Sequence, residues 1–459
     1  MKRIIILGAG QVGQTLAEAL GADGHAITVV DQDAVRLQAL RTELGVATVQ
    51  GFAAHPPVLE NAGARDAEML IAVTDSDEVN MMACQVATTL FNVGTRIARA
   101  RSRDYHRFPR LFARDAVPVD LLISPEETVT SQIHRLIEHP GALQVLDFAD
   151  GRVSLVAVRA YHGGPLVGRE LRTLRGSRPG TRTRVAAIFR QDRPLDPDGD
   201  TVIEADDEVF FVAAKKNIRA VTGELRHLER PYRRVIIAGG GNIGRRLAET
   251  LAEDYRVKIV ERDSRRAQLL ASELPNDVLV LEGSAADDRF LEEIDTDHAD
   301  VFCAVTNDDQ ANIVSGMLAK RRGVRKVISL INRPSYVDLV QSGSIDVAIS
   351  PQLATVAVLL AKVREGGTAT VHTLRRGAAE AIETVVHGDA MTSQVVNRRI
   401  DELHLPQGAT MGALVRGEEV IIPHHDTVVN AGDHAILFLT DRSRVSEVQR
   451  LFQPSPLFF

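Results

Sequence analysis

The sequence predicts an α/β fold, with two doubly wound parallel-sheet domains that are each followed by a small α+β domain. Three observations support this prediction. Two G-x-G-x-x-G turns, at 8–13 and 239–244, each stand between a short apolar run and a helical pattern. An acidic residue, Asp31 or Glu261, closes the apolar run that follows each turn. The third observation is that the whole pattern occurs twice along the chain, which makes two dinucleotide-type (Rossmann) folds the working interpretation.

The repeat extends beyond the glycine turns. The segment 73–80 returns at 305–312. In the smaller units, a pair formed by Arg190 and Asp207 recurs as Arg416 and Asp433, with both members displaced equally along the chain. A repeated large–small unit explains both recurrences.

The elements of the first half follow in order. The large domain alternates strands with amphipathic helices, and strands separated by helices pair in parallel. Its strands are predicted at 4–7, 27–30, 69–73 and 95–98. Next, Ser124 as N-cap and Pro125 at the first helical position predict a helix that ends near His139. Short runs separated by turn residues then predict the strands of a small domain, at 153–158, 185–189 and 209–213.

We therefore expect four domains. The large domains are expected at 1–124 and 232–350, and the small ones at 142–228 and 370–453. The last residues, 454–459, are too few and too rich in proline for a regular element, so they are expected to fray or to dock as a peptide.

Composition limits the class of protein. The 459 residues are 44% hydrophobic and 25% charged, as in a soluble globular protein, and the net charge of -7 argues against nucleic acid as a partner. No run approaches the roughly 18 apolar residues that span a bilayer. The basic and apolar start, 1–7, meets its glycine turn too early for a signal peptide, so it is expected to be a strand. Cys84 and Cys303 lie at non-equivalent positions, which predicts no disulfide and fits a reducing cytosol.

The glycine turns are the candidate phosphate sites. The first glycine permits a tight strand-to-helix turn, the second lets the backbone approach a pyrophosphate, and the third lets the helix pack closely on the sheet. The helix N-terminus offers free N–H groups to the phosphates. A nucleotide-type fold that has lost its ligand is the alternative. The candidate residues are Gly8, Ala9, Gly10, Gln11, Val12, Gly13, Gly239, Gly240, Gly241, Asn242, Ile243 and Gly244.

Acidic and polar residues at strand ends complete the candidate sites. Asp31 and Glu261 stand where a carboxylate accepts hydrogen bonds from the adenosine ribose, which favours NAD(H) or adenine nucleotides over NADP(H); a solvated acid is the alternative. Polar residues end the fourth strand of each large domain at the ligand edge of the sheet, although N-capping alone explains part of that pattern. These residues are Thr74, Asp75, Thr306 and Asn307. Arg99 ends the fifth strand as a possible phosphate contact, and we match it with Ile331, so the second site should grip its ligand differently.

The sequence contains no recognisable catalytic set. The 14 histidines are scattered, no His/Cys/carboxylate cluster has metal-site spacing, and no G-x-S-x-G elbow occurs. The small domains offer no catalytic base of the kind that a dehydrogenase's substrate domain supplies. We therefore predict a binding protein, neither an enzyme nor a metalloprotein.

Several segments together resemble the TrkA family, the peripheral nucleotide-binding subunits of bacterial Trk potassium uptake systems. The likeness covers essentially the full length, including the duplicated layout. The segments that carry it are Gly8–Gly13 with Val29–Asp31, Ala72–Thr74 with Asn80, Gln144-Val145, Gly163–Leu166, Arg184–Arg190 and Leu451–Pro456.

The resemblance implies two RCK units per chain, each with a nucleotide-binding N-terminal (RCK N) domain and a TrkA-C (RCK C) domain. It implies a homotetrameric ring on the cytosolic face of the inner membrane, where the ring gates a TrkH- or TrkG-like potassium transporter. It also implies NAD+ or NADH as ligand, with ATP and ADP as competing or alternative ligands. The glycine, ribose-acid and strand-four positions given above carry over.

Two other interpretations stay open at this point. A soluble NAD-dependent oxidoreductase would turn over nicotinamide with some substrate. A free-standing nucleotide sensor would have no membrane partner. The sequence does not decide which nucleotide is the physiological signal, nor which pore subunit is bound.

Overall fold

The structure, a computed structural model, describes four domains and two long connecting helices. The predicted tail at 454–459, the predicted boundary at 228 and Pro165-Leu166 lie outside the described part of the chain. The described residues are 1–112, 116–164, 167–172, 183–191, 193–195, 197–218, 220, 230–333, 336–337, 340, 345–364, 369–374, 379–441 and 444–453.

The first large domain is a six-stranded parallel sheet in the order β3-β2-β1-β4-β5-β6. That order is the doubly wound order of dinucleotide-binding folds. Its strands are β1 (Arg3–Leu7), β2 (Ala26–Asp31), β3 (Ala47–Gln50), β4 (Met69–Ala72), β5 (Thr95–Arg99) and β6 (Leu121–Ile123). Its helices are α1 (Gln11–Ala22), α2 (Ala34–Leu44), α3 (Pro56–Asn61), α4 (Asp77–Phe91) and α5 (Arg103–Arg107).

The second large domain repeats this sheet in the order β14-β13-β12-β15-β16-β17, again parallel. Two parallel sheets of this kind confirm the predicted fold class. The strands are β12 (Arg234–Ala238), β13 (Arg256–Glu261), β14 (Leu279–Glu282), β15 (Val301–Ala304), β16 (Lys326–Leu330) and β17 (Val347–Ile349). The helices are α8 (Asn242–Leu251), α9 (Ser264–Glu273), α10 (Asp288–Glu293) and α11 (Asp309–Arg321).

The small domains are antiparallel sheets with equivalent strand orders, β10-β9-β11-β8-β7 and β21-β20-β22-β19-β18. The first contains β7 (Ala142–Phe148), β8 (Val153–Arg159), β9 (Thr183–Arg190), β10 (Arg193–Leu195) and β11 (Glu208–Ala214). The second contains β18 (Ala369–Leu374), β19 (Ala379–Val385), β20 (Ala409–Arg416), β21 (Glu419–Ile421), β22 (His434–Leu439) and the helix α14 (Val445–Phe452). The two sheets share one core, in which the rings of Phe148 and Phe438 meet edge to face at 6.4 Å.

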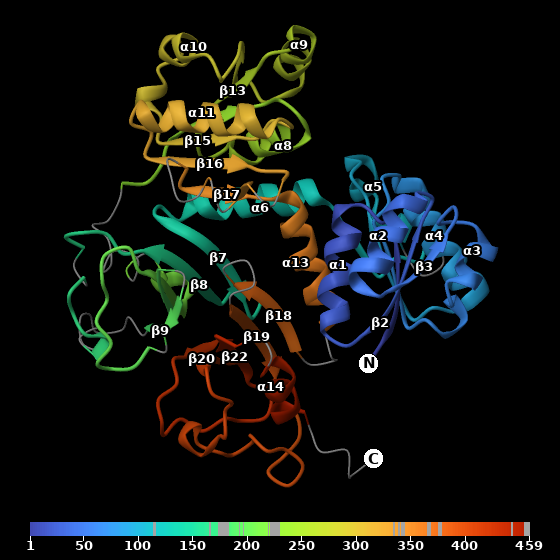
Figure 1. The fold of residues 1–459 in the computed structure, drawn as a ribbon. Coiled ribbons are helices and arrows are strands. Elements are labelled where there is room, and N and C mark those ends of the chain that lie inside the picture. The colour runs from blue at the N-terminus through green and yellow to red at the C-terminus, as the bar shows by residue number, and fades with distance from the viewer. Residues whose placement is uncertain are drawn as a thin grey trace.

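The connecting helices, α6 (Pro125–Glu138) and α13 (Pro351–Arg364), exchange between the large domains. The α6 helix begins as predicted, because Ser124 Oγ accepts from the Glu127 N–H at 3.1 Å. It leaves the first sheet and packs on α8 of the second large domain, while α13 packs on α1 of the first (Figure 1). Ile133 of α6 is fully buried in one core with Leu247 of α8, and Leu359 of α13 in one core with Leu16 of α1.

This exchange joins the two large domains. Each fully buried leucine or isoleucine contributes about 2 kcal/mol of apolar burial, so separating the domains would expose a substantial apolar surface.

The free thiols of Cys84 and Cys303 are both buried, and burial raises the pKa of each to about 12. Among the described helices, none has the length and apolar character to cross a membrane.

Candidate functional site

A cavity of about 1210 Å³ lies between the two large domains and is lined by both glycine turns. The carboxyl ends of both parallel sheets meet there, as expected for ligand sites of doubly wound sheets. Of the predicted site residues, Ala9, Gly13 and Gly244 support the turns without lining the cavity. The lining residues that the sequence predicted are Gly8, Gly10, Gln11, Val12, Asp31, Thr74, Asp75, Arg99, Gly239, Gly240, Gly241, Asn242, Ile243, Glu261, Thr306 and Asn307.

The glycine turns have the geometry that their spacing predicts. Gly8 has a φ of +107°, a backbone conformation that side chains disfavour. A Cβ on Gly13 would lie 1.8 Å from the Gly8 carbonyl oxygen, so the helix can approach the turn only with glycine there. By contrast, a Cβ on Gly10 would meet nothing within 4 Å, which leaves open space beside the backbone at the start of α1.

The second turn has the same geometry. Gly239 has a φ of +113°, a Cβ on Gly244 would lie 1.8 Å from the Gly239 carbonyl oxygen, and Gly241 faces open space. No side chain caps α1 or α8, because glycine is the N-cap residue of both. Two uncapped helix N-termini therefore point at one cavity, and such termini attract anions.

The two predicted ribose acids bind backbone N–H groups in this structure. Asp31 accepts from the Ala9 N–H at 2.6 Å and from the Asp33 N–H at 2.9 Å. Glu261 accepts from the Gly240 and Asp263 N–H groups, both at 2.9 Å. Each carboxylate thus ties its glycine turn to the helix that follows the next strand. A contact of either carboxylate with a ribose stays a prediction. The carboxylate oxygens retain the capacity to accept further hydrogen bonds.

Thr74 and Thr306 are held by buried asparagines. The Asn80 amide oxygen accepts from the Thr74 N–H at 3.0 Å and from the Thr74 Oγ1 at 2.7 Å, and its Nδ2 donates to the Thr74 and Arg99 carbonyl oxygens. Asn312 makes the same four bonds, to Thr306 and to the Leu330 carbonyl oxygen. One fully buried amide therefore joins the ends of two neighbouring strands in each large domain.

The strand register corrects our match for Arg99. Ala98 pairs with Ala72 and Ser329 with the equivalent Ala304, so Arg99 corresponds to Leu330. Ile331 corresponds to Ala100 instead. The segment that joins β15 to β16 is one residue shorter than the segment that joins β4 to β5, so the constant spacing of the repeat fails across it. A buried leucine therefore replaces the arginine in the second site, and a different grip on the ligand stays a prediction.

Arg99 is the cation most deeply embedded in the first site. Its side chain is only 8% exposed, and its Nη2 donates to the Thr74 carbonyl oxygen at 2.6 Å. Among the described residues, no acceptor reaches its Nε. Burial lowers the pKa of this guanidinium to about 10, so it still carries its charge at neutral pH.

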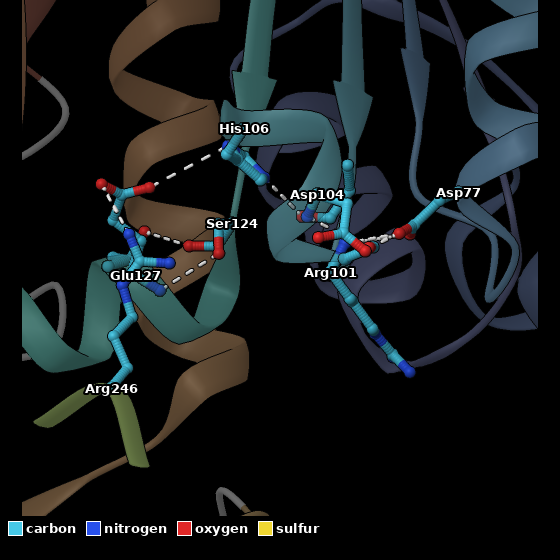
Figure 2. Close-up of polar contacts among 10 residues, drawn as sticks. Asp77, Arg101, Asp104, His106, Ser124, Glu127 and Arg246 are labelled. Carbon is cyan, nitrogen blue, oxygen red and sulfur yellow. Dashed lines mark hydrogen bonds and ion pairs between the residues drawn. The ribbon is translucent and has the colours of Figure 1, made fainter. Parts of the chain in front are cut away.

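The sequence patterns did not predict α5, which connects the first site to the second large domain. Asp77, the first residue of α4, accepts from the Arg101 and Ser102 N–H groups just before α5, which joins the starts of the two helices (Figure 2). On the other side of α5, Arg103 and Glu249 of α8 approach to 2.6 Å. Arg103 and Glu249 are residue types that are common on protein surfaces, so the sequence does not indicate their contact. The contact follows from the exchange of the connecting helices between the domains.

A second polar contact runs parallel to it. Glu127 of α6 lies between His106 of α5, at 4.0 Å, and Arg246 of α8, at 3.0 Å (Figure 2). The His106 Nε2 lies 2.9 Å from the Ala100 carbonyl oxygen, which fixes the ring beside the end of β5. Both α5 and α6 therefore make polar contacts with α8.

Comparison with known proteins gives a family for all four domains. The model of the TrkA-N domain matches residues 4–125 and 235–351, and the model of the TrkA-C domain matches 155–226 and 390–453. A Trk system potassium uptake protein TrkA of Halomonas elongata is 59% identical over 457 residues, covering all of both chains. The proteins of the same name from Vibrio alginolyticus and Haemophilus influenzae are 57% and 49% identical, over 99% of this chain and all of theirs.

Solved structures agree on the fold. The crystal structure of the GsuK RCK domain has a TM-score of 0.62 at 19% identity and covers 98% of this chain and 95% of its own. The GsuK channel bound to NAD has the same TM-score and identity, with 98% of this chain and 78% of the channel covered. At that identity these likenesses show the fold alone.

Proposed function

We propose a nucleotide-controlled gating role for this chain, which belongs to the TrkA family of Trk potassium uptake systems. As a member of that family it is a regulatory component of potassium transport and not an enzyme. The observation that carries the proposal is the cavity lined by glycine turns from both large domains. A ligand bound between two domains can favour one of their arrangements over another.

The proposed ligands are NAD(H) and adenine nucleotides. Asp31 and Glu261 would repel a 2′-phosphate, which favours NAD(H) over NADP(H). The two uncapped helix N-termini and the open space at Gly10 and Gly241 suit a pyrophosphate. A channel of the same fold has been solved with NAD bound, which is consistent with this choice.

The proposed mechanism is a population shift. A nucleotide changes gating only through its different affinity for two conformations of the assembly. Moving a two-state equilibrium from 1:99 to 99:1 takes a preference of about 10⁴, near 5.5 kcal/mol, which several sites can share. The contacts of α5 and α6 with α8 offer a path by which occupancy of the cavity alters the large domains.

The proposed assembly is a homotetrameric ring. Four chains would supply eight large domains, and closed symmetric assembly is the usual way for repeated surfaces to be buried. Exposed apolar side chains on the outer helices support such contacts. They are Met82 and Leu90 of α4, and Val314 and Met317 of α11.

The proposed partner is a TrkH- or TrkG-like membrane potassium transporter, which membership of a Trk system favours. The ring would attach to it at the cytosolic face of the inner membrane through protein contacts. Co-purification from detergent-solubilised membranes tests this attachment. A chain that leaves the membrane fraction with no transporter bound would favour a free-standing nucleotide sensor instead.

Calorimetric titration with NADH, NAD+, ATP and ADP, beside a turnover assay, tests the nucleotide function. We expect binding without consumption of the ligand.

Light scattering gives the number of chains in the assembly directly, because each chain has a mass of 50.0 kDa. A stable monomer at micromolar concentration with nucleotide present would contradict the ring.

A further inference from the structure

Four cavity-lining positions are charged in the first large domain and uncharged in the second. They lie at the ends of β4 and β5 and at the start of the connecting helix that follows β6 or β17. Strand register and the Ser-Pro at each helix start establish the equivalences. Asp75, Arg99, Arg101 and Glu126 correspond to Asn307, Leu330, Asn332 and Gln352.

The sheet order says which part of a ligand meets these positions. The ribose acid ends β2, the glycine turn follows β1, and β4 and β5 lie on the other side of β1. A nucleotide with its adenosine at β2 and its pyrophosphate at the glycine turn therefore extends its far end toward β4 and β5. The charged positions of the first domain and the uncharged positions of the second therefore lie at or beside the strands toward which that far end extends.

Burial decides which of the charges matter most. Asp75 and Arg101 are exposed, so solvent screens them. Arg99 is more than nine-tenths buried, and its Nε has no acceptor among the described residues. Glu126 likewise has a buried carboxylate oxygen, Oε2, without a donor. Arg99 is thus a buried cation whose hydrogen bonds are incomplete. The nearby Glu126 carboxylate compensates only part of its positive charge.

The second site has the opposite character. Leu330 is 4% exposed at the position of Arg99, and Gln352 stands at the position of Glu126. Gln352 Nε2 already donates to Thr15 Oγ1 of α1 at 3.1 Å. A phosphate at this end would lose its hydration and meet no cation, which is unfavourable. A planar ring with an amide group would instead find an apolar side chain and amide partners.

We propose that the first large domain binds a nucleoside triphosphate, whose far end is anionic, and that the second binds a dinucleotide whose far end is a reduced, uncharged nicotinamide. This assignment rests on the proposed nucleotide-binding function and deepens it. The two domains would then report two different signals to one assembly. Arg99 is the residue that sets the preference, and Glu126 balances its charge when the site is empty.

The experiment titrates the full chain with two probes, ATP in the presence of magnesium and NADH. A Gly241→Ala background weakens the second turn, because the added methyl fills the space that the pyrophosphate needs. In that background we expect Arg99→Leu with Glu126→Gln to lower ATP affinity at least 10-fold and NADH affinity less than 3-fold. Arg99→Lys keeps the charge and should retain most of the ATP affinity.

The reciprocal variant tests the same assignment independently of how the first site folds. In a Gly10→Ala background, Leu330→Arg with Gln352→Glu should raise ATP affinity at the second domain at least 10-fold. Thermal midpoints of the unliganded variants check that the fold is kept. Equal losses of ATP and NADH affinity in the first domain, or no gain of ATP affinity in the second, would overturn the assignment.

The wild-type titrations separate this inference from the function on which it rests. Binding of neither probe would refute the proposed nucleotide function. Binding of both probes at both domains, with no preference for either, would leave that function intact and refute only the assignment of ligands to domains.

Discussion

The two large domains have the same backbone and the same polar supports, yet they differ in the side chains that face the cavity. Asn80 and Asn312 make equivalent hydrogen bonds. In both glycine turns, a Cβ added to the third glycine would lie 1.8 Å from the carbonyl oxygen of the first. Four lining positions at or beside the ends of β4 and β5 are instead charged, whereas their equivalents in the second domain are uncharged. The repeat thus retains what builds the turn and varies what meets the ligand.

A second difference lies at the ribose acid, and there two positions change together. The first domain combines Ala9 with Asp31, whereas the second combines Gly240 with Glu261. A Cβ on Gly240 would lie 3.0 Å from the Glu261 Oε2 and 2.3 Å from the Leu270 Cδ1. The Leu270 side chain and the longer acid therefore occupy space that an alanine would need, and both domains still form the same N–H to carboxylate bond.

The small domains show the opposite case at one buried ion pair, which is the same in both. Arg190 donates from Nε and Nη2 to the two carboxylate oxygens of Asp207 at 2.9 and 2.8 Å, and Arg416 does the same to Asp433 at the same distances. Both aspartates are almost fully buried. The recurrence of this pair in the sequence is therefore structural, because a buried carboxylate needs its paired arginine.

The largest expected effect comes from the third glycine of each turn. Gly13→Ala and Gly244→Ala each place a Cβ 1.8 Å from a backbone carbonyl oxygen, which only a backbone shift relieves. We expect each to lower local stability by more than about 3 kcal/mol and to abolish nucleotide binding in its own domain. Hydrogen exchange of α1 and α8 measures the two domains separately.

The second glycine of each turn is the matched control. Gly10→Ala and Gly241→Ala meet no atom within 4 Å and should change local stability by no more than about 1 kcal/mol while weakening the ligand. If α1 were equally protected from hydrogen exchange in Gly13→Ala and Gly10→Ala, that result would contradict the steric clash expected at the third glycine.

The next effect tests the shared polar support. Asn80→Ala and Asn312→Ala each remove four hydrogen bonds made by a fully buried amide and leave buried backbone groups without partners. The expected cost is about 3 kcal/mol in each domain. Urea-induced loss of protection near β4 and β15 measures it. A cost in only one domain would break the equivalence of the two sites.

The hydrogen bonds of Asn80 and Asn312 are one example of how far the sequence predicts the structure. The glycine turns, the apolar strands β1, β2, β4 and β5 and the start of α6 follow from local patterns, and the structure has them. The strands β6 and β10 were not predicted, since their three residues show no clear period, and the four-residue β3 and the seven-residue β7 were not predicted either. The spacing between Thr74 and Asn80, repeated at Thr306 and Asn312, was a visible signal of the network, although the sequence alone does not show its bonds.

Long-range packing was the larger omission. Periodicity shows that α6 has an apolar face with Ile133 on it, but it does not show which domain covers that face. The exchange of α6 and α13 therefore had to come from the structure, and with it the contact of Arg103 with Glu249. The error at Arg99 has a local cause, because the segment before β16 is one residue shorter than the segment before β5. The exact domain boundaries stay a prediction.

A smaller effect is expected at the ribose acids. Asp31→Ala should weaken nucleotide binding at the first domain roughly 10-fold, about 1.4 kcal/mol. The variant also loses the bonds to the Ala9 and Asp33 N–H groups, so Asp31→Asn, which keeps one oxygen acceptor, is the control. Titration in the Gly241→Ala background gives the affinity. Unchanged affinity in both variants would mean that Asp31 only supports the turn.

The smallest effect tests whether the two changes at the ribose acid compensate each other. Gly240→Ala alone should cost about 1–2 kcal/mol, because its methyl meets Glu261 and the flexible end of Leu270. Glu261→Asp alone should cost about 1 kcal/mol, since the shorter acid leaves a gap to the Gly240 N–H. The double variant rebuilds the combination of the first domain, in which Ala9 shares a core with Leu40.

A double-mutant cycle then measures the coupling between positions 240 and 261. We expect the double variant to recover about 1 kcal/mol relative to the sum of the single costs, because the shorter acid makes room for the methyl and both atoms of the hydrogen bond return to the geometry of Asp31 and Ala9. Ala9→Gly in the first domain, which should cost less than about 1 kcal/mol, controls for the loss of one methyl. Hydrogen exchange of the turn after β12 is the measurement. Additive costs would show that the two domains reached different acids independently, and the paired change would then carry no information about how either turn is built.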